Sequence, residues 1–307
     1  MTDQNLDVSD ISANATPADT VSMGRQLRTA LAALKRAPLV PTMILGFLIC
    51  FAVFAPLIAP HDPIKIDIMS NLTPPAWHEG GSSQYLLGTD KLGRDVLSRM
   101  IYGSRLSLSL SLIVILLGGT AGVLLGMISG YLGGFMDALI QRAVEAMLAL
   151  PTILVALVFV FTFGFGFWNV VFILSPFIAA RFARMVRGET LSIKEREYVA
   201  VAKVIGTSKT GIIFKHILPN VANTVIVLAT LEVGHLILVE SSLSFLGVGI
   251  PPPNPAWGLM VAEGREYIAT AYWISLFPGL AILAAVLSLN LFGDWLRDAL
   301  DPRRKQL

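Results

Sequence analysis

The sequence predicts an all-α protein that crosses a membrane several times. Of its 307 residues, 54% are hydrophobic and 14% are charged, against about a quarter charged in a typical soluble domain. The mean hydropathy is +0.69. The apolar residues gather in uncharged runs that reach the roughly 20 residues a transmembrane helix needs. These three observations exclude an ordinary soluble domain.

Six membrane spans are expected. The uncharged run 146–180 would form a single helix about 52 Å long, far more than a hydrocarbon core of about 30 Å. We therefore expect two spans there, with a tight turn at Gly164–Asn169. The other expected spans are Leu39–Ala59, Leu106–Ser129, Val221–Leu246 and Ala271–Leu291.

Lys and Arg residues indicate the orientation, because they are enriched in cytoplasmic segments. With the N-terminus inside, 17 of the 23 Lys and Arg residues fall on the cytoplasmic side. The polar residues 1–22 contain no basic residue and are expected to be disordered rather than a secretory signal. The expected order is a cytoplasmic tail 1–37, a first transmembrane helix 38–60, a periplasmic loop 61–104 and a core domain 105–307 with five transmembrane helices. Both termini are then cytoplasmic.

A polar segment, about 194–220, interrupts the apolar runs on the expected cytoplasmic side. Gly206 is suited to end a first helix in the left-handed conformation, and Thr207 or Ser208 to cap the next. A second amphipathic piece, Ile212–Leu218, leads into Pro219. A helix–Gly–helix across the mouth of a bundle predicts a docking surface for a soluble partner. Its apolar residues are expected to be Tyr198, Val201, Ala202, Ile205 and Phe214.

A glycine stripe repeats every four residues in span two, at Gly118, Gly122, Gly126 and Gly130. Small residues allow helix backbones to approach closely in lipid, so helix packing is the favoured interpretation. A stripe that lines a pore is the alternative.

Span five carries Glu232, His235 and Glu240. Ionisable groups are expensive in a membrane and usually face a cavity. One hypothesis is that they line the path of a substrate. The other is that Glu232 pairs with His235 while Glu240 caps or bonds a neighbouring helix. The sequence leaves both open.

Two further charged groups receive structural interpretations. Arg181, Arg184 and Arg187 are expected to anchor the end of span four to lipid headgroups rather than to sense voltage. On the outer side, Asp90 is expected to cap a helix near Lys91, and Asp95 to pair with Arg99 four residues later.

No catalytic or metal site is expected. The segment around Gly206 lacks the ending of a phosphate-binding loop, and the four histidines show no ligand spacing. Any ATP and Mg²⁺ must then be bound by partner subunits, so no cofactor is expected in this chain. Cys50 has no partner cysteine within the chain. The net charge of +2 argues against nucleic acid as a partner.

Five segments together resemble the permease subunits of bacterial ATP-binding-cassette importers for peptides. The resemblance covers roughly residues 38–304 in the order of the family, and the outer loop looks most like the second permease of dipeptide importers. The segments are "LGTDKLGRDVLSRMIYGSRLSLSL", "GYLGGFMDALIQRAVEAMLALPTILVAL", "REYVAVAKVIGTSKTGIIFKHILPN", "ESSLSFLGVGIPPPNPAWGLMVAEGR" and "FPGLAILAAVLSLNLFGDWLRDALDPR".

The resemblance implies the type I importer fold and a set of partners. It implies a heterodimer with a second permease, two cytoplasmic ATPase subunits and a periplasmic substrate-binding protein, in the bacterial inner membrane. The cargo would be di- or oligopeptides. The alternatives are another small solute, such as glutathione or a nickel complex, a secondary transporter driven by protons, or a scaffold or channel subunit that transports nothing itself.

The resemblance also places the coupling loop of the family on 194–220. Its glutamate position is Ala200, its second position is Val201 and its isoleucine position is His216, so three positions depart from the family pattern. A loop that lacks the glutamate is expected either to dock one ATPase more weakly or to leave that contact to the partner permease. The positions that keep the pattern are Ala202, Gly206, Leu218 and Pro219.

Overall fold

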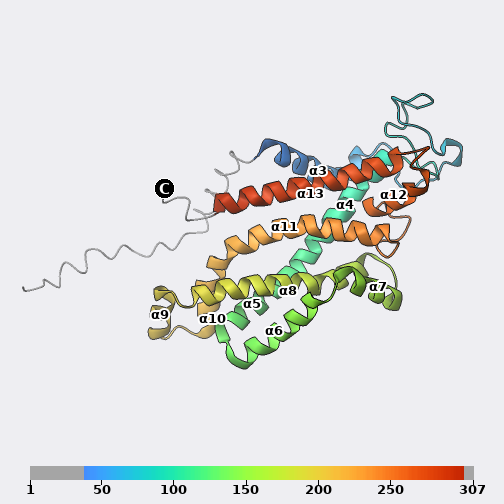
Figure 1. The fold of residues 1–307 in the computed structure, drawn as a ribbon. Helices are drawn as coiled ribbons and strands as arrows, with labels where there is room; N and C mark the ends of the chain where they lie inside the picture. The colour runs from blue at the N-terminus through green and yellow to red at the C-terminus, as the bar shows by residue number, and fades with distance from the viewer. Residues whose placement is uncertain (1–37, 301–307) are drawn as a thin grey trace, which may run out of the picture. The chain divides into compact units, whose positions relative to one another are not determined.

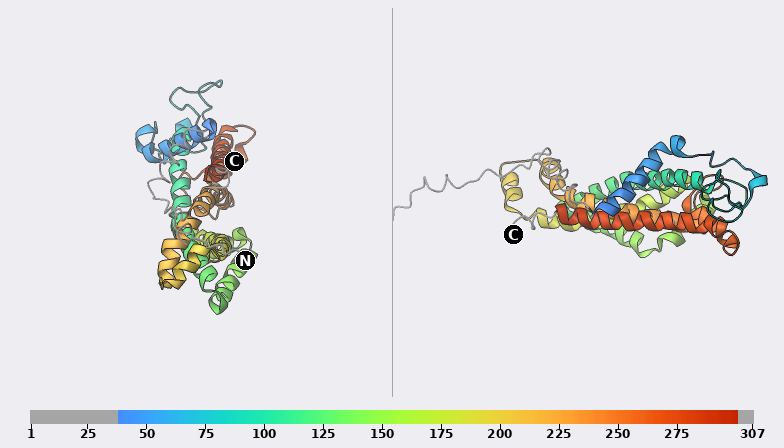
Figure 2. Two further views of the ribbon diagram at one scale, coloured as in Figure 1. Left: turned by 90° about the vertical axis from the view of Figure 1, so that its left-hand side faces the viewer. Right: turned by 90° about the horizontal axis from the view of Figure 1, so that it is seen from above.

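The protein is described by a computed structural model of residues 38–300 (Figures 1 and 2). The expected disorder of the N-terminal tail lies outside the described residues. Within 38–300 the structure is helical and contains no named strand, which confirms the all-α prediction. Five helices there are long and apolar enough to cross a membrane, and a bent helix pair makes a sixth if it is counted as one span.

The first two spans are α3 (Leu39–Ile58) and the continuous rod α4 (Val96–Val114), η2 (Ile115–Gly119) and α5 (Thr120–Leu132). The rod begins ten residues before the expected Leu106. Asp95 is its N-cap and accepts a hydrogen bond from the Ser98 N–H at 2.9 Å. The predicted helix start near Lys91, capped by Asp90, is therefore wrong.

The third crossing is a bent pair, α6 (Gly134–Ala149) and α7 (Thr152–Phe163), whose axes differ by 88°. The break falls at Leu150–Pro151, because proline disfavours the helical conformation in the residue before it. A single straight span from residue 146 is therefore wrong. The expected turn is confirmed, since Gly164 and Gly166 have φ of +90° and +145° between α7 and α8 (Phe167–Ile193).

After α8 the chain forms two short helices at one end of the bundle. These are α9 (Glu197–Val204) and α10 (Lys209–Ile212), and α10 continues through η3 (Ile213–Ile217) into the long α11 (Leu218–Phe245). The chain then forms α12 (Trp257–Gly264), η4 (Arg265–Tyr267) and α13 (Trp273–Leu300). The start of α3 and the end of α13 both lie toward the α9 end, whereas α12 lies at the opposite end (Figure 1). This arrangement agrees with an even number of crossings.

The glycine stripe packs α5 against α8, as predicted. A Cβ atom placed on Gly126 would lie 2.7 Å from the Ala183 carbonyl oxygen, and one on Gly130 would lie 2.7 Å from the Thr190 Cβ. Gly118 and Gly122 similarly face the backbone carbonyls of Ser175 and Ala179. No side chain fits at these positions without separating the two helices.

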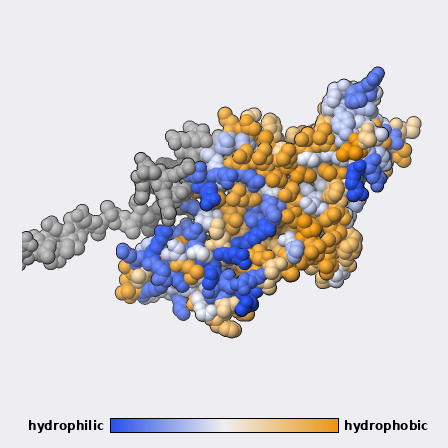
Figure 3. All heavy atoms as spheres, viewed as in Figure 1, coloured by the Kyte–Doolittle hydropathy of each residue, from blue (hydrophilic) through white to orange (hydrophobic). Residues whose placement is uncertain are grey.

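The remaining helices pack side by side, with α11 between α8 and α13, and α3 against α4 and α13 (Figures 1 and 2). Trp257 fixes α12 to α4, because its indole N–H donates to the Met100 carbonyl at 2.9 Å. The visible face is broadly apolar over the middle of the bundle, and hydrophilic residues gather at the α9 end (Figure 3). Such a surface suits a chain whose middle lies in lipid.

Candidate functional site

The turn between α9 and α10 has the geometry that the sequence predicts. Gly206 has φ of +80°, and the N–H of Thr207 donates to the Ala202 carbonyl at 3.0 Å, so the helix ends in a left-handed glycine cap. Ser208, rather than Thr207, caps the next helix by accepting from the Gly211 N–H at 3.1 Å. These contacts fix the two short helices relative to each other.

The two short helices expose large apolar side chains at the α9 end, which we call the coupling surface. Four of the five were expected from the spacing, and Val204 was not. Its neighbours on α9, Val199 and Ala202, are buried, so α9 uses one face to pack and presents the other. The exposed fractions are 36% for Tyr198, 59% for Val201, 87% for Val204, 73% for Ile205 and 53% for Phe214.

The motif positions suggested by the family resemblance divide between packing and exposure. Ala200 is exposed beside the coupling surface, and Ala202 is buried instead of contributing to it. The ring of His216, half-buried, lies 6.3 Å from the ring of Tyr198, which brings α9 and η3 together. Leu218 is half-buried, and Pro219 is exposed in the first turn of α11, where a missing N–H breaks no hydrogen bond.

The charged groups of α8 pair within the protein. The Arg181 Nη1 lies 2.8 Å from the Glu232 Oε2 of α11. Arg187 makes a bidentate pair with Asp137 of α6, with N···O distances of 2.6 and 2.7 Å. The predicted anchoring to headgroups is therefore wrong for Arg181 and Arg187, because both meet carboxylates of neighbouring helices. Arg184 is exposed and has no side-chain partner within residues 38–300.

The three polar residues of α11 do not form one site. Glu232 pairs with Arg181, and no hydrogen bond or ion pair joins it to His235 within the described residues, so the pairing that was one alternative is wrong. Glu240 is fully buried; its Oε1 accepts from the Ser244 hydroxyl at 2.7 Å and its Oε2 from the Ser107 hydroxyl of α4 at 3.4 Å. Glu240 thus bonds a neighbouring helix, as the second hypothesis expected.

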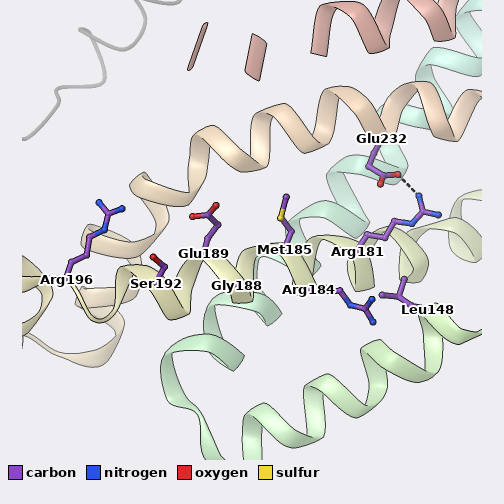
Figure 4. A pocket seen from close by; sticks show the side chains of 9 residues that line it. All are labelled: Leu148, Arg181, Arg184, Met185, Gly188, Glu189, Ser192, Arg196 and Glu232. Carbon is purple, nitrogen blue, oxygen red and sulfur yellow. Dashed lines mark hydrogen bonds and ion pairs between the residues drawn. The ribbon is translucent and has the colours of Figure 1, made fainter. Parts of the chain in front are cut away.

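A cavity of about 790 Å³ runs along α8 between Glu232 and the α9 end (Figure 4). Its volume falls within the range of about 300–1,000 Å³ typical of small-molecule sites. Its lining is rich in charge, and neither His235 nor Glu240 belongs to it. The lining residues are Leu148, Arg181, Arg184, Met185, Gly188, Glu189, Ser192, Arg196 and Glu232.

A second charged cluster is buried at the α12 end. The Arg94 Nε lies 2.7 Å from the Asp90 Oδ2, and the Arg94 Nη2 lies 3.0 Å from the Glu263 Oε2. Arg99, fully buried, pairs with the same two carboxylates. The expected Asp95–Arg99 pair is therefore wrong. The cluster joins the connection 59–95 to α4 and α12.

Sequence reasoning missed the partners in these clusters because they are far apart in the chain. Arg181 and Glu232 are separated by 51 positions, and Arg187 and Asp137 by 50. The available signal was an arginine series on one predicted span beside an acid on another, since such groups rarely remain unpaired in a membrane. Within residues 38–300 no group of three His, Cys, Asp or Glu residues is arranged to hold a metal ion.

Comparison with known proteins places this geometry in a family. Residues 122–306 match the sequence profile described as the binding-protein-dependent transport system inner membrane component. Residues 35–75 match the profile described as the N-terminal TM domain of oligopeptide transport permease C.

Three curated relatives cover most of the chain. The di/tripeptide transport system permease protein DppC of Pseudomonas aeruginosa is 42% identical over 83% of this chain and 84% of its own length. The dipeptide transport system permease protein DppC of Haemophilus influenzae is 41% identical, over 88% and 92% respectively. The protein of the same name from Escherichia coli is 43% identical, over 83% and 85%. The multi-pass bundle, the short helices at its α9 end and these matches together show that the chain belongs to the family of inner membrane components of binding-protein-dependent transport systems.

Proposed function

We propose that this chain is one of two permease subunits of an ATP-driven importer that carries dipeptides across the bacterial inner membrane. The observation that carries the proposal is the coupling surface, which exposes five large apolar side chains at one end of a membrane bundle. An apolar patch of this kind on a soluble-facing end marks an interaction site. The names of the relatives, which specify dipeptides or di- and tripeptides, support the choice of cargo.

The proposed assembly contains a second permease, two ATPase subunits that bind ATP and Mg²⁺, and a periplasmic protein that delivers the peptide. In this assembly the α9 end and both termini are cytoplasmic, and the connection 59–95 with α12 faces the periplasm. The excess of Lys and Arg residues on the side of α9 supports this orientation.

In the proposed mechanism, closure of the ATPase dimer moves α9 and α10 as rigid bodies. Because α10 continues without a break into α11, the displacement reaches Glu232 and the cavity beside it. The bundle then alternates between two access states. Glu232 keeps its proposed role in the cargo path since it lines the cavity, whereas the burial of Glu240 favours a structural role for that residue.

Site-directed cross-linking tests the proposal. Cys50 is first replaced by Ala, and a single cysteine is introduced by Val204→Cys in the assembled transporter. A short bismaleimide is expected to join Val204→Cys to an ATPase subunit. The control is Leu57→Cys, which is exposed at the far end of α3 and is expected to capture no ATPase. Equal capture at both positions, or external labelling of Val204→Cys by an impermeant maleimide, would contradict the proposal.

Uptake of radiolabelled alanyl-alanine by cells that carry the complete transporter tests the cargo. Import that requires ATP and is not competed by glutathione or a nickel complex is expected. Uptake that survives ATP depletion but collapses with the proton gradient would instead favour a secondary transporter.

A further inference from the structure

The cavity along α8 contains charges of opposite sign that the protein leaves without charged partners. Arg184 has no side-chain partner within residues 38–300. Glu189 accepts one long hydrogen bond, from the Thr224 hydroxyl at 3.4 Å, and makes no ion pair there. By contrast, Arg181 and Glu232 neutralise each other at the other end of the cavity. Figure 4 shows Arg181 directed at Glu232, whereas Arg184 points away from that pair.

This part of α8 cannot face lipid. Arg181 lies 14 residues from the start of the helix, or about 21 Å along its axis, which is within a hydrocarbon core of about 30 Å. Charged side chains at such depth face the interior of a bundle or a water-filled path. The lining positions recur every three or four residues along α8, from Arg181 to Ser192, so they form one helix face. That face therefore borders an aqueous path that leads toward the α9 end.

We propose that Arg184 and Glu189 form a transient binding site for a zwitterionic peptide, with Arg184 bound to the cargo carboxylate and Glu189 to its ammonium group. This inference rests on the proposed function and adds the two residues that would recognise the cargo. Five helical positions separate Arg184 from Glu189, a rise of about 7.5 Å. Two extended residues span up to about 7 Å, so a dipeptide matches this separation.

The chemistry of the two groups accounts for both recognition and release. A guanidinium holds a carboxylate through two parallel hydrogen bonds, which a neutral amide cannot reproduce. Arg184 is exposed and Glu189 is half-buried, so water weakens both contacts. A transport path needs sites that bind the passing solute weakly enough to let it leave. The Arg181–Glu232 pair needs no contribution from the cargo, because its charges are already matched.

Reconstituted transport provides the first test. The complete transporter, with its partner subunits and binding protein, is placed in proteoliposomes and supplied with radiolabelled alanyl-alanine. Arg184→Gln is expected to lower peptide transported per ATP hydrolysed about tenfold, the loss of one charge-assisted contact, while the ATPase rate stimulated by the binding protein stays at the wild-type level. Arg184→Lys is expected to recover most of the transport. The matched control is Arg142→Gln, an exposed arginine of α6 outside the cavity, for which no change is expected.

Photo-cross-linking provides a second test that does not remove a charge. A benzoylphenylalanine in place of Met185, which lines the cavity, is expected to capture labelled alanyl-alanine during turnover. The same group in place of Leu283, an exposed residue of α13, is expected to capture none.

Two outcomes would overturn the inference while leaving the proposed function intact. One is wild-type transport per ATP in Arg184→Gln, and the other is capture at Met185 no greater than at Leu283. Failure of the wild-type transporter to move alanyl-alanine at all would instead contradict the proposed function.

Discussion

Arg99 of α4 and Glu263 of α12 form a buried ion pair, with the Nη1 2.7 Å from the Oε2, although 164 positions separate them in the chain. Asp90 and Arg94 complete the cluster. The long connection 59–95 is therefore tied to both α4 and α12 by charge. In the proposed orientation, this ordered surface is the one that meets the periplasmic binding protein.

Loss of one carboxylate from this cluster is expected to destabilise the protein. Glu263→Gln leaves Arg94 and Arg99 buried with only Asp90 to balance them, and removal of one partner of a buried pair costs about 3–5 kcal/mol. The measurement is the free energy of unfolding in detergent. As a control, Arg142→Gln breaks an exposed pair with Glu145 and is expected to change stability by less than about 1 kcal/mol. Equal effects of the two substitutions would contradict the role of the cluster.

A single methyl group in the glycine stripe is expected to disturb the α5–α8 interface. The Cβ of Gly126→Ala would meet the Ala183 carbonyl oxygen at 2.7 Å, and such overpacking costs about 1–3 kcal/mol. Gly46→Ala on α3 is the matched control, because nothing lies within 4 Å of its Cβ. Denaturation in mixed micelles compares the two variants. Equal stability of Gly126→Ala and Gly46→Ala would show that the helices have room to separate.

The cap at Gly206 yields a prediction about coupling. Gly206→Pro removes the φ of +80° and the N–H that donates to the Lys203 carbonyl, so α9 and α10 lose their fixed angle. Peptide uptake is expected to be lost while the amount of protein in the membrane stays normal. Gly206→Asn is expected to retain uptake, since asparagine tolerates the left-handed conformation. Wild-type uptake by Gly206→Pro at normal abundance would count against the coupling role.

Glu240 separates a structural role from a role in the cargo path. Glu240→Gln keeps an oxygen that accepts from Ser244, so folding and uptake are both expected to stay near the wild-type level. Glu240→Leu is expected to lower stability by about 1–3 kcal/mol, because the Ser244 hydroxyl loses its partner in a buried site. Detergent unfolding and peptide uptake measure the two effects. A stable but inactive Glu240→Gln protein would restore Glu240 to the path.

The sequence predicts the parts of this protein that depend on local patterns. The spans follow from hydrophobic length, the turn before α8 from its glycines, and the α9–α10 corner from Gly206 and Ser208. The spacing of the glycine stripe likewise predicts its packing against another helix, though not that the partner is α8.

The errors arise where a distant group competes with a local one. Arg99 was expected to pair with Asp95 four residues away, but Asp95 caps α4 and Arg99 reaches Glu263 instead. The start of the third crossing was placed after the last charge of α6, whereas Asp137 is neutralised by Arg187 and belongs to the bent pair. A one-dimensional pattern carries no record of which helices become neighbours.

The uninterrupted backbone from Lys209 to Phe245 has a mechanical consequence. It spans 37 residues, or about 55 Å, and begins beside the exposed ring of Phe214. Within that length no flexible joint is present to absorb a push, so force applied near Phe214 travels as along a connecting rod to the level of Arg181 and Glu232. Axial stiffness of this one helix, rather than a relay of side chains, would then set how faithfully the work of ATP becomes movement at the cargo.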